Sequence, residues 1–574
     1  MQTLKELAPY LDDEFARAIT VSVPDIVDRF KENPYCLLDF ELEDYECPTF
    51  DQIDSKVTLK TFEDRKREVR AALTFILKAN EMQGNSYMDI DLLCKRTLRL
   101  LSRSAHPLNY GSITAFLNYY SSYFAIDYTR NIVSRLKTRQ EEWKIFYGLK
   151  ALKENYLDFF RYEPIDKTNI LDDSQLMCAR NVIKCKSNVA LLTGGPGTGK
   201  TTTIKSVVDG IDYYYPEYNT VLLAPSGKAA ARLQEVFLGY NVKIKTIHMF
   251  CGFRDENDPS AKINIKKIAT DIKNTNVIII DESSMVAQDV LARLFEFVDF
   301  RNTKIIFVGD EDQLPAVGCG DIINTLKRFK VCHEHLTVNY RSAMAINVNA
   351  ANINKGISDV VEDDSFEFIN ISNYNIEDYL IENIVYRVNN NDTAVLLNPY
   401  KAVERKGNIR SLNRRVQIAR FGEGPYVSSN RFEANDRVLL THTNYAKKYF
   451  NGYTGTYVGY DRQTDSYKVL LDYLDKVVLV NNDFDIQLNY AQTIHKSQGS
   501  EYDYVDVYIP EYTKFVTRRA LYTAITRGKK KVRVFSTPDI YRLIVNNKDV
   551  ERNSYINIWI DDDLSDSNYY YKYD

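Results

Sequence analysis

The chain has 574 residues, of which 44% are hydrophobic and 26% are charged, as in ordinary soluble globular proteins. A chain of this length predicts three or four domains with sizeable cores. The formal net charge of -4 excludes a uniformly basic chain, although it leaves room for local positive charge.

The spacing of the cysteines and the length of the apolar runs exclude further classes of protein. No two cysteines form a C-x-x-C pair, so we predict neither a zinc site nor an iron–sulfur cluster, and we expect reduced thiols. No apolar run reaches the roughly 20 residues that cross a bilayer, and the first residues lack the apolar core of a signal peptide. We therefore expect a soluble cytoplasmic protein without membrane contact.

Residues 1–160 are predicted to form a mostly helical N-terminal domain. Apolar residues recur there at helical spacing, as at Val69, Leu73, Ile76 and Leu77. No chemical motif stands in this part of the chain, so its role stays open.

From residue 161 to residue 330, short apolar runs alternate with polar turns and helical stretches. Each run predicts a buried parallel strand, because strands covered on both faces are continuously apolar. Such alternation builds a doubly wound α/β sheet that carries ligand groups at the carboxyl ends of its strands. The runs cover residues 189–192, 221–224, 277–280 and 305–308.

A second α/β lobe is predicted from residues 331–410 and 486–550. Between its two parts, residues 411–485 hold short strands separated by turns, which predict a small inserted β-barrel. Residues 551–574 are predicted as an acidic C-terminal tail, and from Asp561 onward we expect a disordered or loosely docked end.

A glycine-rich loop directly follows the first apolar run. Residues 194–201 read Gly-Gly-Pro-Gly-Thr-Gly-Lys-Thr and fit G-x-x-x-x-G-K-[ST]. Its backbone N–H groups can wrap phosphates at a helix N-terminus, Lys200 would reach the β- and γ-phosphates, and the Thr201 hydroxyl would bind Mg²⁺. The predicted nucleotide contacts of the loop are Gly195, Pro196, Gly197, Thr198, Gly199, Lys200, Thr201 and Thr202.

Polar groups also follow two later strands of the same predicted sheet. Asp281 can hold Mg²⁺ at the end of its strand, and the adjacent Glu282 can polarise an attacking water. An acidic pair after a strand is by itself more often a solvated turn, but the phosphate loop upstream favours the functional interpretation. The Gln313 amide, after the next strand, can sense a γ-phosphate by hydrogen bonding.

These residues stand in an ordered set of motifs that resembles the superfamily 1 helicases, and the RecD-like group in particular. The resemblance covers about residues 170–536, and it includes Gln175, which resembles an adenine-reading glutamine ahead of the phosphate loop. The matching segments are 224–233 (motif Ia), 246–248 (Ib), 281–285 (II), 309–315 (III), 339–342 (IV), 490–501 (V) and 521–528 (VI).

The resemblance implies two RecA-like lobes with ATP and Mg²⁺ in the cleft between them, and an SH3-like fold for residues 411–485. It also implies two arginine fingers from the second lobe, which fits the need for cations on the developing charge of the γ-phosphate. The implied catalytic residues are Lys200, Glu282, Gln313, Arg341 and Arg527, and the implied metal ligands are Thr201 and Asp281.

The same resemblance implies that single-stranded DNA crosses both lobes, held through its phosphates without sequence reading. Residues 251–272 would carry a strand-separating β-hairpin, the pin, with Phe253 as a wedge. The implied DNA contacts are Pro225, Ser226, Thr246, His248, Phe253, Thr493, His495, Ser497 and Gln498.

The main hypothesis is an ATP-dependent DNA helicase that moves 5′→3′ on single strands and unwinds duplex DNA in replication, recombination or repair. We expect a monomer that acts with replication or recombination partners. The alternatives are an RNA helicase of the same superfamily, a motor subunit of a recombination nuclease, and a P-loop switch protein. Motifs IV to VI argue against the switch, because a switch needs no second RecA-like lobe.

Overall fold

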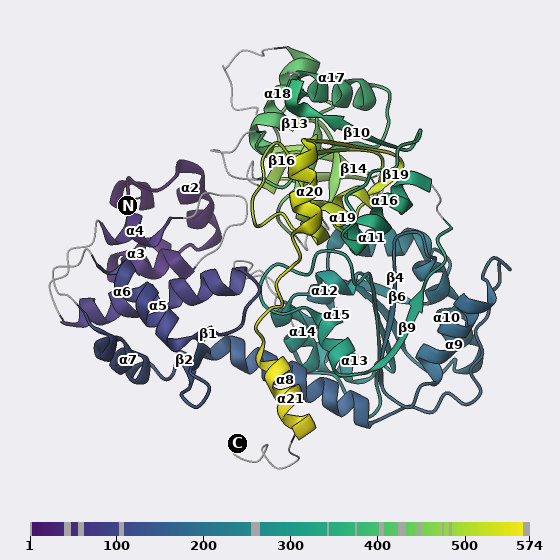
Figure 1. Ribbon diagram of the computed structural model, residues 1–574, viewed down its shortest axis with the longest axis horizontal. Helices are drawn as coiled ribbons and strands as arrows, with labels where there is room; N and C mark the ends of the chain where they lie inside the picture. The colour runs from purple at the N-terminus through teal and green to yellow at the C-terminus, as the bar shows by residue number, and fades with distance from the viewer. Residues whose placement is uncertain are drawn as a thin grey trace.

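The computed structural model shows a helical N-terminal unit beside two α/β lobes that are stacked on one another (Figure 1). None of the described helices is long and apolar enough to cross a membrane. The structure describes residues 3–39, 48–55, 62–102, 108–253, 265–340, 344–373, 376–400, 407–422, 432–444, 447, 449–472, 476–481 and 485–565.

The N-terminal unit encloses a hydrophobic core of its own, with Phe15, Phe50, Leu73 and Leu93 fully buried. Several of its helices start at a polar side chain that caps them, as Asp89 does for α6 by accepting a hydrogen bond from the Leu92 N–H at 2.9 Å. The elements are α1(Leu4–Leu7), α2(Asp13–Ser22), α3(Ile26–Glu32), η1(Pro34–Asp39), α4(Phe50–Asp54), α5(Phe62–Met82), β1(Met88–Asp89), α6(Ile90–Leu100), α7(Tyr110–Tyr119), β2(Phe124–Asp127) and β3(Ile132–Arg135).

The first lobe is a six-stranded parallel sheet of order β6-β5-β7-β8-β4-β9 with helices on both faces. The long helix α8 leads into it from the N-terminal unit and packs Ile145, Phe146 and Leu149 into the core of one face. All four predicted strands are present. The elements are α8(Leu136–Glu154), α9(Asp173–Lys184), β4(Val189–Gly194), α10(Lys200–Tyr214), β5(Thr220–Ala224), α11(Gly227–Val236), β6(Lys243–Thr246), α12(Ile247–Cys251), α13(Ile265–Lys273), β7(Val277–Ile280), η2(Ser283–Met285), α14(Gln288–Phe295), β8(Lys304–Gly309), α15(Ile322–Arg328) and β9(Cys332–Leu336).

The second lobe is a five-stranded parallel sheet of order β10-β19-β18-β11-β17. Val395, Val505, Val507, Val532 and Val534 are buried in its core. Its elements are α16(Met344–Lys355), β10(Phe366–Asn370), η3(Ile371–Asn373), α17(Ile376–Asn389), β11(Ala394–Asn398), α18(Ile409–Phe421), β17(Ala491–Thr493), η5(His495–Ser497), β18(Tyr502–Tyr508), α19(Arg518–Ile525), β19(Gly528–Ser536) and α20(Pro538–Asn546).

An antiparallel sheet of order β15-β14-β13-β12-β16 is inserted into the second lobe. It packs on the first lobe at helix α11, where a Cβ atom added to Gly227 would lie 2.4 Å from the Cβ of Phe450. The strand β16 pairs with β12, so the sheet extends just beyond the predicted boundary at residue 485. Its strands are β12(Arg437–Leu440), β13(Thr454–Asp461), β14(Ser466–Leu471), β15(Lys476–Val480) and β16(Ile486–Leu488).

After α20 the chain returns from the second lobe to the first and forms α21(Tyr555–Ser565), which lies against α8 (Figure 1). Ion pairs fix this helix: Asp561 pairs with Arg328 and Asp562 with Arg130. The expectation of a loosely docked end from Asp561 onward is therefore wrong for the residues up to Ser565, and residues 566–574 lie outside the described part.

Candidate functional site

The glycine-rich loop lies between the carboxyl end of β4 and the amino end of α10, as its strand–loop–helix context predicts. Gly197 and Gly199 have φ angles of 77° and 81°, which only glycine adopts without strain. A Cβ atom on Gly199 would also lie 2.2 Å from the Nε2 atom of Gln175. The loop thus needs glycine both for its backbone and for the close approach of the glutamine.

Two cations of this region have only neutral hydrogen-bond acceptors in the described part of the chain. The Lys200 Nζ atom donates to the carbonyl oxygens of Gly194 at 2.7 Å and Gly195 at 3.0 Å. Arg527 is 4% exposed and donates to the carbonyl oxygens of Thr523 at 3.0 Å and Ser500 at 3.2 Å. Buried cations are normally paired with carboxylates, so this arrangement fits an anionic ligand.

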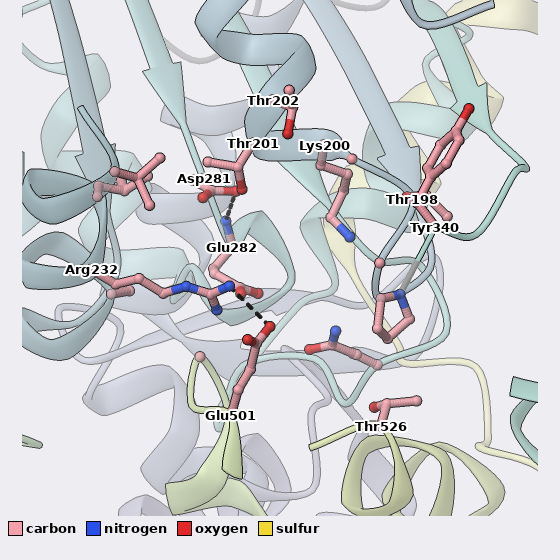
Figure 2. A pocket seen from close by; sticks show the side chains of 18 of the residues that line it. Thr198, Lys200, Thr201, Thr202, Arg232, Asp281, Glu282, Tyr340, Glu501 and Thr526 are labelled. Atoms are coloured by element: carbon pink, nitrogen blue, oxygen red, sulfur yellow. Dashed lines mark hydrogen bonds and ion pairs between the residues drawn. The ribbon is translucent and has the colours of Figure 1, made fainter. Parts of the chain in front are cut away.

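The acidic pair lies at the carboxyl end of β7, facing the phosphate loop (Figure 2). Glu282 has a φ angle of 51°, a strained conformation for a residue with a side chain, and such strain is concentrated at functional sites. Burial, together with the neighbouring Glu282 carboxylate, raises the pKa of Asp281 to about 6, against the effect of Lys200. Two carboxylates held this close at a phosphate-binding loop can hold a divalent cation.

A cavity of about 530 Å³ joins these groups, and it is lined from both lobes. The first lobe supplies most of the lining and the second supplies residues of its motifs IV, V and VI. Of the predicted residues, Gly195 does not line the cavity but offers its carbonyl oxygen to Lys200, and Arg341 lies outside the described residues. The predicted residues that line it are Gln175, Pro196, Gly197, Thr198, Gly199, Lys200, Thr201, Thr202, Asp281, Glu282, Gln313 and Arg527.

Both glutamines of the cavity are bound to their own lobe. The Gln175 amide donates to the Thr198 carbonyl oxygen at 3.1 Å and accepts from the Asp172 N–H at 3.1 Å. The Gln313 amide donates to Asp310 at 3.1 Å, while its buried Oε1 atom has no hydrogen-bond partner among the residues that the structure describes. Gln175 therefore supports the phosphate loop, and the Gln313 Oε1 atom can still accept a hydrogen bond.

Three cavity residues were not assigned a role by the sequence analysis. Arg232 and Glu501 form an ion pair at 2.9 Å that joins the first lobe to the second (Figure 2). Tyr340 is 49% exposed and is the one aromatic ring among the described lining residues; its N–H donates to the Gly197 carbonyl oxygen at 2.9 Å. All three stand inside the quoted motifs, so the motif segments were a usable signal, but their contacts join distant parts of the chain.

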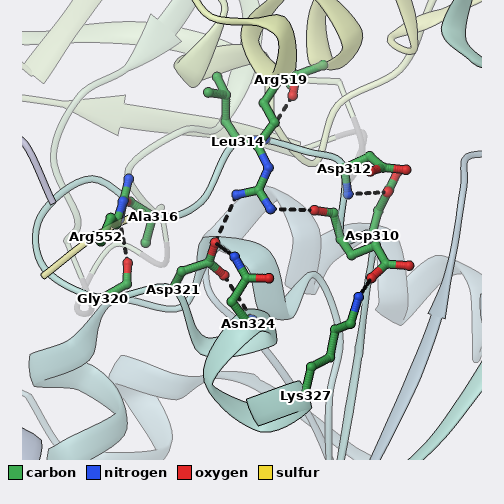
Figure 3. A network of polar contacts seen from close by, with 12 residues as sticks. Asp310, Asp312, Leu314, Ala316, Gly320, Asp321, Asn324, Lys327, Arg519 and Arg552 are labelled. Atoms are coloured by element: carbon green, nitrogen blue, oxygen red, sulfur yellow. Dashed lines mark hydrogen bonds and ion pairs between the residues drawn. The ribbon is translucent and has the colours of Figure 1, made fainter. Parts of the chain in front are cut away.

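Behind the cavity, the loop after β8 is held by the second lobe (Figure 3). Arg519 of α19 donates to Asp321 at 2.8 Å and to the Glu311 carbonyl oxygen at 2.8 Å. The Leu314 N–H donates to the Thr523 hydroxyl at 2.9 Å, and the Leu314 carbonyl oxygen accepts from the Gln498 amide at 2.7 Å. Motif III is thereby bonded to motifs V and VI.

The predicted DNA contacts of the first lobe follow the carboxyl ends of β5 and β6, on the sheet edge that carries the phosphate loop. Pro225 and Ser226 are half-buried, and Ser226 caps α11. Thr246 is buried and caps α12 by accepting from the Met249 N–H at 3.1 Å. His248 is half-buried, and burial lowers its pKa.

The predicted DNA contacts of the second lobe divide into two groups. Thr493 is half-buried at the end of β17, and His495 is exposed. Ser497 is fully buried and donates to the Ile494 carbonyl oxygen at 2.7 Å, and Gln498 is bonded to Leu314 as described. In this structure Ser497 and Gln498 therefore make contacts inside the protein.

The predicted pin differs from what the structure shows. Residues 265–272 lie in the helix α13, so they form no β-hairpin, and residues 254–264 lie outside the described part. The ring centroid of Phe253 lies 4.9 Å from that of His248, and the side chain packs against the core of the first lobe. Its partial burial leaves it less free to act as a wedge than the sequence analysis assumed.

Models of known protein families match a segment of each lobe. A model of the AAA domain matches residues 179–319, and a model of the UvrD-like helicase C-terminal domain matches residues 488–535. The RecBCD enzyme subunit RecD of Mycobacterium tuberculosis is 30% identical over 420 residues, which cover 64% of this chain and 70% of that subunit.

Two further relatives are longer than the matched region. The ATP-dependent RecD2 DNA helicase of Deinococcus radiodurans is 27% identical over 353 residues, which cover 60% of this chain and 46% of that helicase. The uncharacterized protein MJ1519 of Methanocaldococcus jannaschii is 26% identical over 462 residues, which cover 65% of this chain and 39% of that protein. The match thus spans less than half of these two relatives.

Proposed function

Because this chain belongs to the RecD family of superfamily 1 helicases, and so is an ATP-dependent DNA helicase, we propose that it moves 5′→3′ along single-stranded DNA and unwinds the duplex ahead of it. The observation that carries this proposal is the cavity lined by Lys200 of one lobe and Arg527 of the other, neither of which has a carboxylate partner among the described residues. The polarity is proposed from the family.

The residues of the cavity fit Mg²⁺ and ATP. The positive φ angles of Gly197 and Gly199 would turn loop N–H groups toward phosphates, and the Gln313 Oε1 atom, which has no partner among the described residues, can accept from a water. Thr201 and Asp281 would hold the metal ion. When bound, Mg²⁺ and ATP supply a polarised γ-phosphate, whose hydrolysis drives movement.

The chain's own groups would act on that phosphate as follows. Lys200 neutralises charge on the phosphates from the first lobe. Glu282 orients the attacking water and accepts its proton at a carboxylate oxygen. Arg527 approaches from the second lobe and stabilises the charge that develops, so that hydrolysis is efficient only when the lobes are closed. Arg341 would add a second cation.

Tyr340 and Gln175 would place the base. The exposed Tyr340 ring lies beside the phosphate loop, where it offers a face for stacking. Gln175 holds Thr198 of the loop through its amide, so its part in reading the base would be combined with support of the loop.

The bonds between motif III and the second lobe would transmit closure to the strand. Arg519, Thr523 and Gln498 all contact the segment 311–321, so a shift of the second lobe moves this segment with it. Single-stranded DNA would pass over the carboxyl ends of β5, β6 and β17, held by phosphate contacts that ignore sequence. We also propose that the protein is a cytoplasmic monomer that acts with replication or recombination proteins.

Strand separation tests the proposed activity and its direction. Two partial duplexes, one with a 5′ and one with a 3′ single-stranded tail, are incubated with the protein, ATP and Mg²⁺, beside a Lys200→Ala control. We expect unwinding of the 5′-tailed duplex alone, lost in the control. Unwinding of the 3′-tailed duplex alone would contradict the polarity.

A motor subunit of a multi-protein nuclease is the second candidate, because a relative is named as a subunit of the RecBCD enzyme. In that case the isolated chain hydrolyses ATP in the presence of DNA but unwinds neither substrate. Addition of a partner complex would then be needed for strand separation.

A further inference from the structure

Lys304, the first residue of β8, is fully buried at the end of the first-lobe sheet opposite the phosphate loop. Its Nζ atom donates to the Ser187 carbonyl oxygen at 2.7 Å and lies 3.2 Å from the Sγ atom of Cys185. Burying an ammonium group without a counterion costs several kcal/mol, so the groups around it should include an anion. No carboxylate acts on its charge in the described part of the chain; the groups that do are Cys185 and Cys332.

The two cysteines lie next to one another in the fold. Cys185 follows the last residue of α9, and Cys332 begins the neighbouring edge strand β9, so the tertiary fold joins residues that are far apart in the sequence. The Cys332 thiol donates to the Asn181 carbonyl oxygen at 3.7 Å, and the Cys185 N–H donates to the same oxygen at 3.0 Å, so one backbone carbonyl joins the two residues. Both side chains are partly exposed, so a small reagent can reach them.

We propose that Cys185, Cys332 and Lys304 form an oxidisable dithiol site, in which Lys304 stabilises the Cys185 thiolate and Cys332 resolves its oxidised form as a disulfide. The site goes beyond the motor activity, since it uses none of the nucleotide or DNA residues. Its co-reactant is hydrogen peroxide, an oxidant that accessible thiolates attack.

The electrostatics agree with this assignment. The neighbouring Cys332 thiol lowers the pKa of Cys185, and the Lys304 ammonium acts in the same direction, while burial opposes both. Cys185, together with burial, raises the pKa of Cys332, which therefore stays protonated as the second thiol. Burial lowers the pKa of Lys304, and the Cys185 thiolate opposes that effect.

The chemistry balances in two steps. The Cys185 thiolate attacks one peroxide oxygen and the O–O bond breaks, which gives a sulfenic acid and hydroxide; sulfur loses two electrons and the peroxide gains them. The Cys332 sulfur then attacks the Cys185 sulfur and the S–O bond breaks. The leaving hydroxide takes the thiol proton as water, so two thiols and one peroxide give one disulfide and two waters.

The full-length wild-type protein supplies the first test. Fully reduced protein is exposed to limiting iodoacetamide at pH 7, and each cysteine is quantified by peptide mass spectrometry. Cys185 should be alkylated at least about tenfold faster than Cys319, which is also partly buried but whose pKa is raised by burial. Equal alkylation rates at the two cysteines would overturn the proposal. Because the test uses the wild-type protein, misfolding of a variant cannot affect the result.

Oxidation supplies the second test. After one equivalent of hydrogen peroxide, a non-reducing digest should contain the Cys185 and Cys332 peptides joined and two hydrogen atoms lighter than the separate pair. In Cys332→Ser, Cys185 should instead accumulate as a sulfenic acid that a 1,3-dione traps. Lys304→Met should slow alkylation of Cys185 while its thermal midpoint shows that it is folded. Peroxide reaction mainly at other cysteines, or a joined peptide without Cys185, would rule the site out.

Discussion

The cavity between the lobes and the docking site of residues 551–565 both join distant segments, but they treat charge in opposite ways. In the cavity, Lys200 and Arg527 donate to neutral carbonyl oxygens. At the docking site, the acidic side chains meet opposite charges or several donors, while Arg552 donates to the carbonyl oxygens of Ala316 and Gly318 at 3.0 Å. Glu142 of α8, for example, accepts from Ser86, Ser554 and the Tyr555 N–H at 2.6–2.9 Å.

This difference distinguishes a ligand-binding site from a contact that only fixes one segment on another. Lys200 and Arg527 differ from Arg552 because they line an open cavity, where a cation without a carboxylate partner indicates a site for an anion. A charge that is fully satisfied within the protein has no capacity left for a ligand and instead fixes one segment on another. Substitutions at the two places should therefore affect different measurements, and the following predictions test that.

The largest effect is expected at Arg527. Arg527→Ala should lower kcat of the DNA-stimulated ATPase by roughly 10³-fold with a smaller change in KM, because a finger acts mainly on the transition state. The measurement is steady-state ATP hydrolysis with saturating single-stranded DNA. Exposed Arg542→Ala in the same lobe is the control, and a proportional loss in both variants would contradict a specific role.

Glu142 should make docking depend on pH. Burial raises its pKa to about 7 from 4.5, against the hydrogen bonds from Ser554 and Ser86. The folded protein therefore binds the proton more tightly than the unfolded chain. Protonation of Glu142 therefore adds to the free energy of unfolding. This contribution is present in full below about pH 4.5, and about 3 kcal/mol of it is lost as pH rises to about 7.

Glu142→Gln should remove that dependence, because the amide stays neutral and the Ser554 hydroxyl can turn to accept from it. The measurement is the free energy of unfolding by denaturant between pH 4.5 and 7, with exposed Glu154→Gln on the same helix as control. Identical slopes for Glu142→Gln and wild type would show that Glu142 does not titrate across this range.

A smaller effect is expected where the two lobes touch. Arg519 and Asp321 are only 21% and 12% exposed, so their pair is screened less than a surface pair. Arg519→Ala should lower the unwinding rate about tenfold while ATP hydrolysis falls less, because closure is transmitted poorly. A double-mutant cycle with Asp321→Ala should give a coupling energy of about 1–2 kcal/mol. Additive effects would mean that the pair does not couple the lobes.

The smallest effect is expected at the rim of the docking site. Lys150 and Asp563 pair at 2.8 Å, but each side chain is 33% exposed. Such pairs contribute about 0.5 kcal/mol or less, so Lys150→Ala should change the free energy of unfolding by no more than this. A loss above about 1 kcal/mol in urea unfolding would show that the rim is as important to docking as Glu142.

The nucleotide site could be predicted because its chemistry is local. Val189 to Thr201 form one strand, one loop and one helix start, and each needs its residues next to one another in the chain. The central strands were also predictable, since burial on both faces demands continuous apolar runs. The edge strands β6 and β9 escaped prediction because an edge tolerates polar residues, such as Lys243 and His333.

The sequence by itself determined that two α/β lobes hold a phosphate-binding loop, an acidic pair and an arginine from motif VI. Only the tertiary structure decided which charges meet: Arg232 with Glu501, Lys304 with Cys185, and the acidic end of α21 with α8 and α15. Motifs are local because a backbone loop must be continuous, whereas an ion pair needs only proximity. Proximity between distant residues is set by the packing of whole lobes.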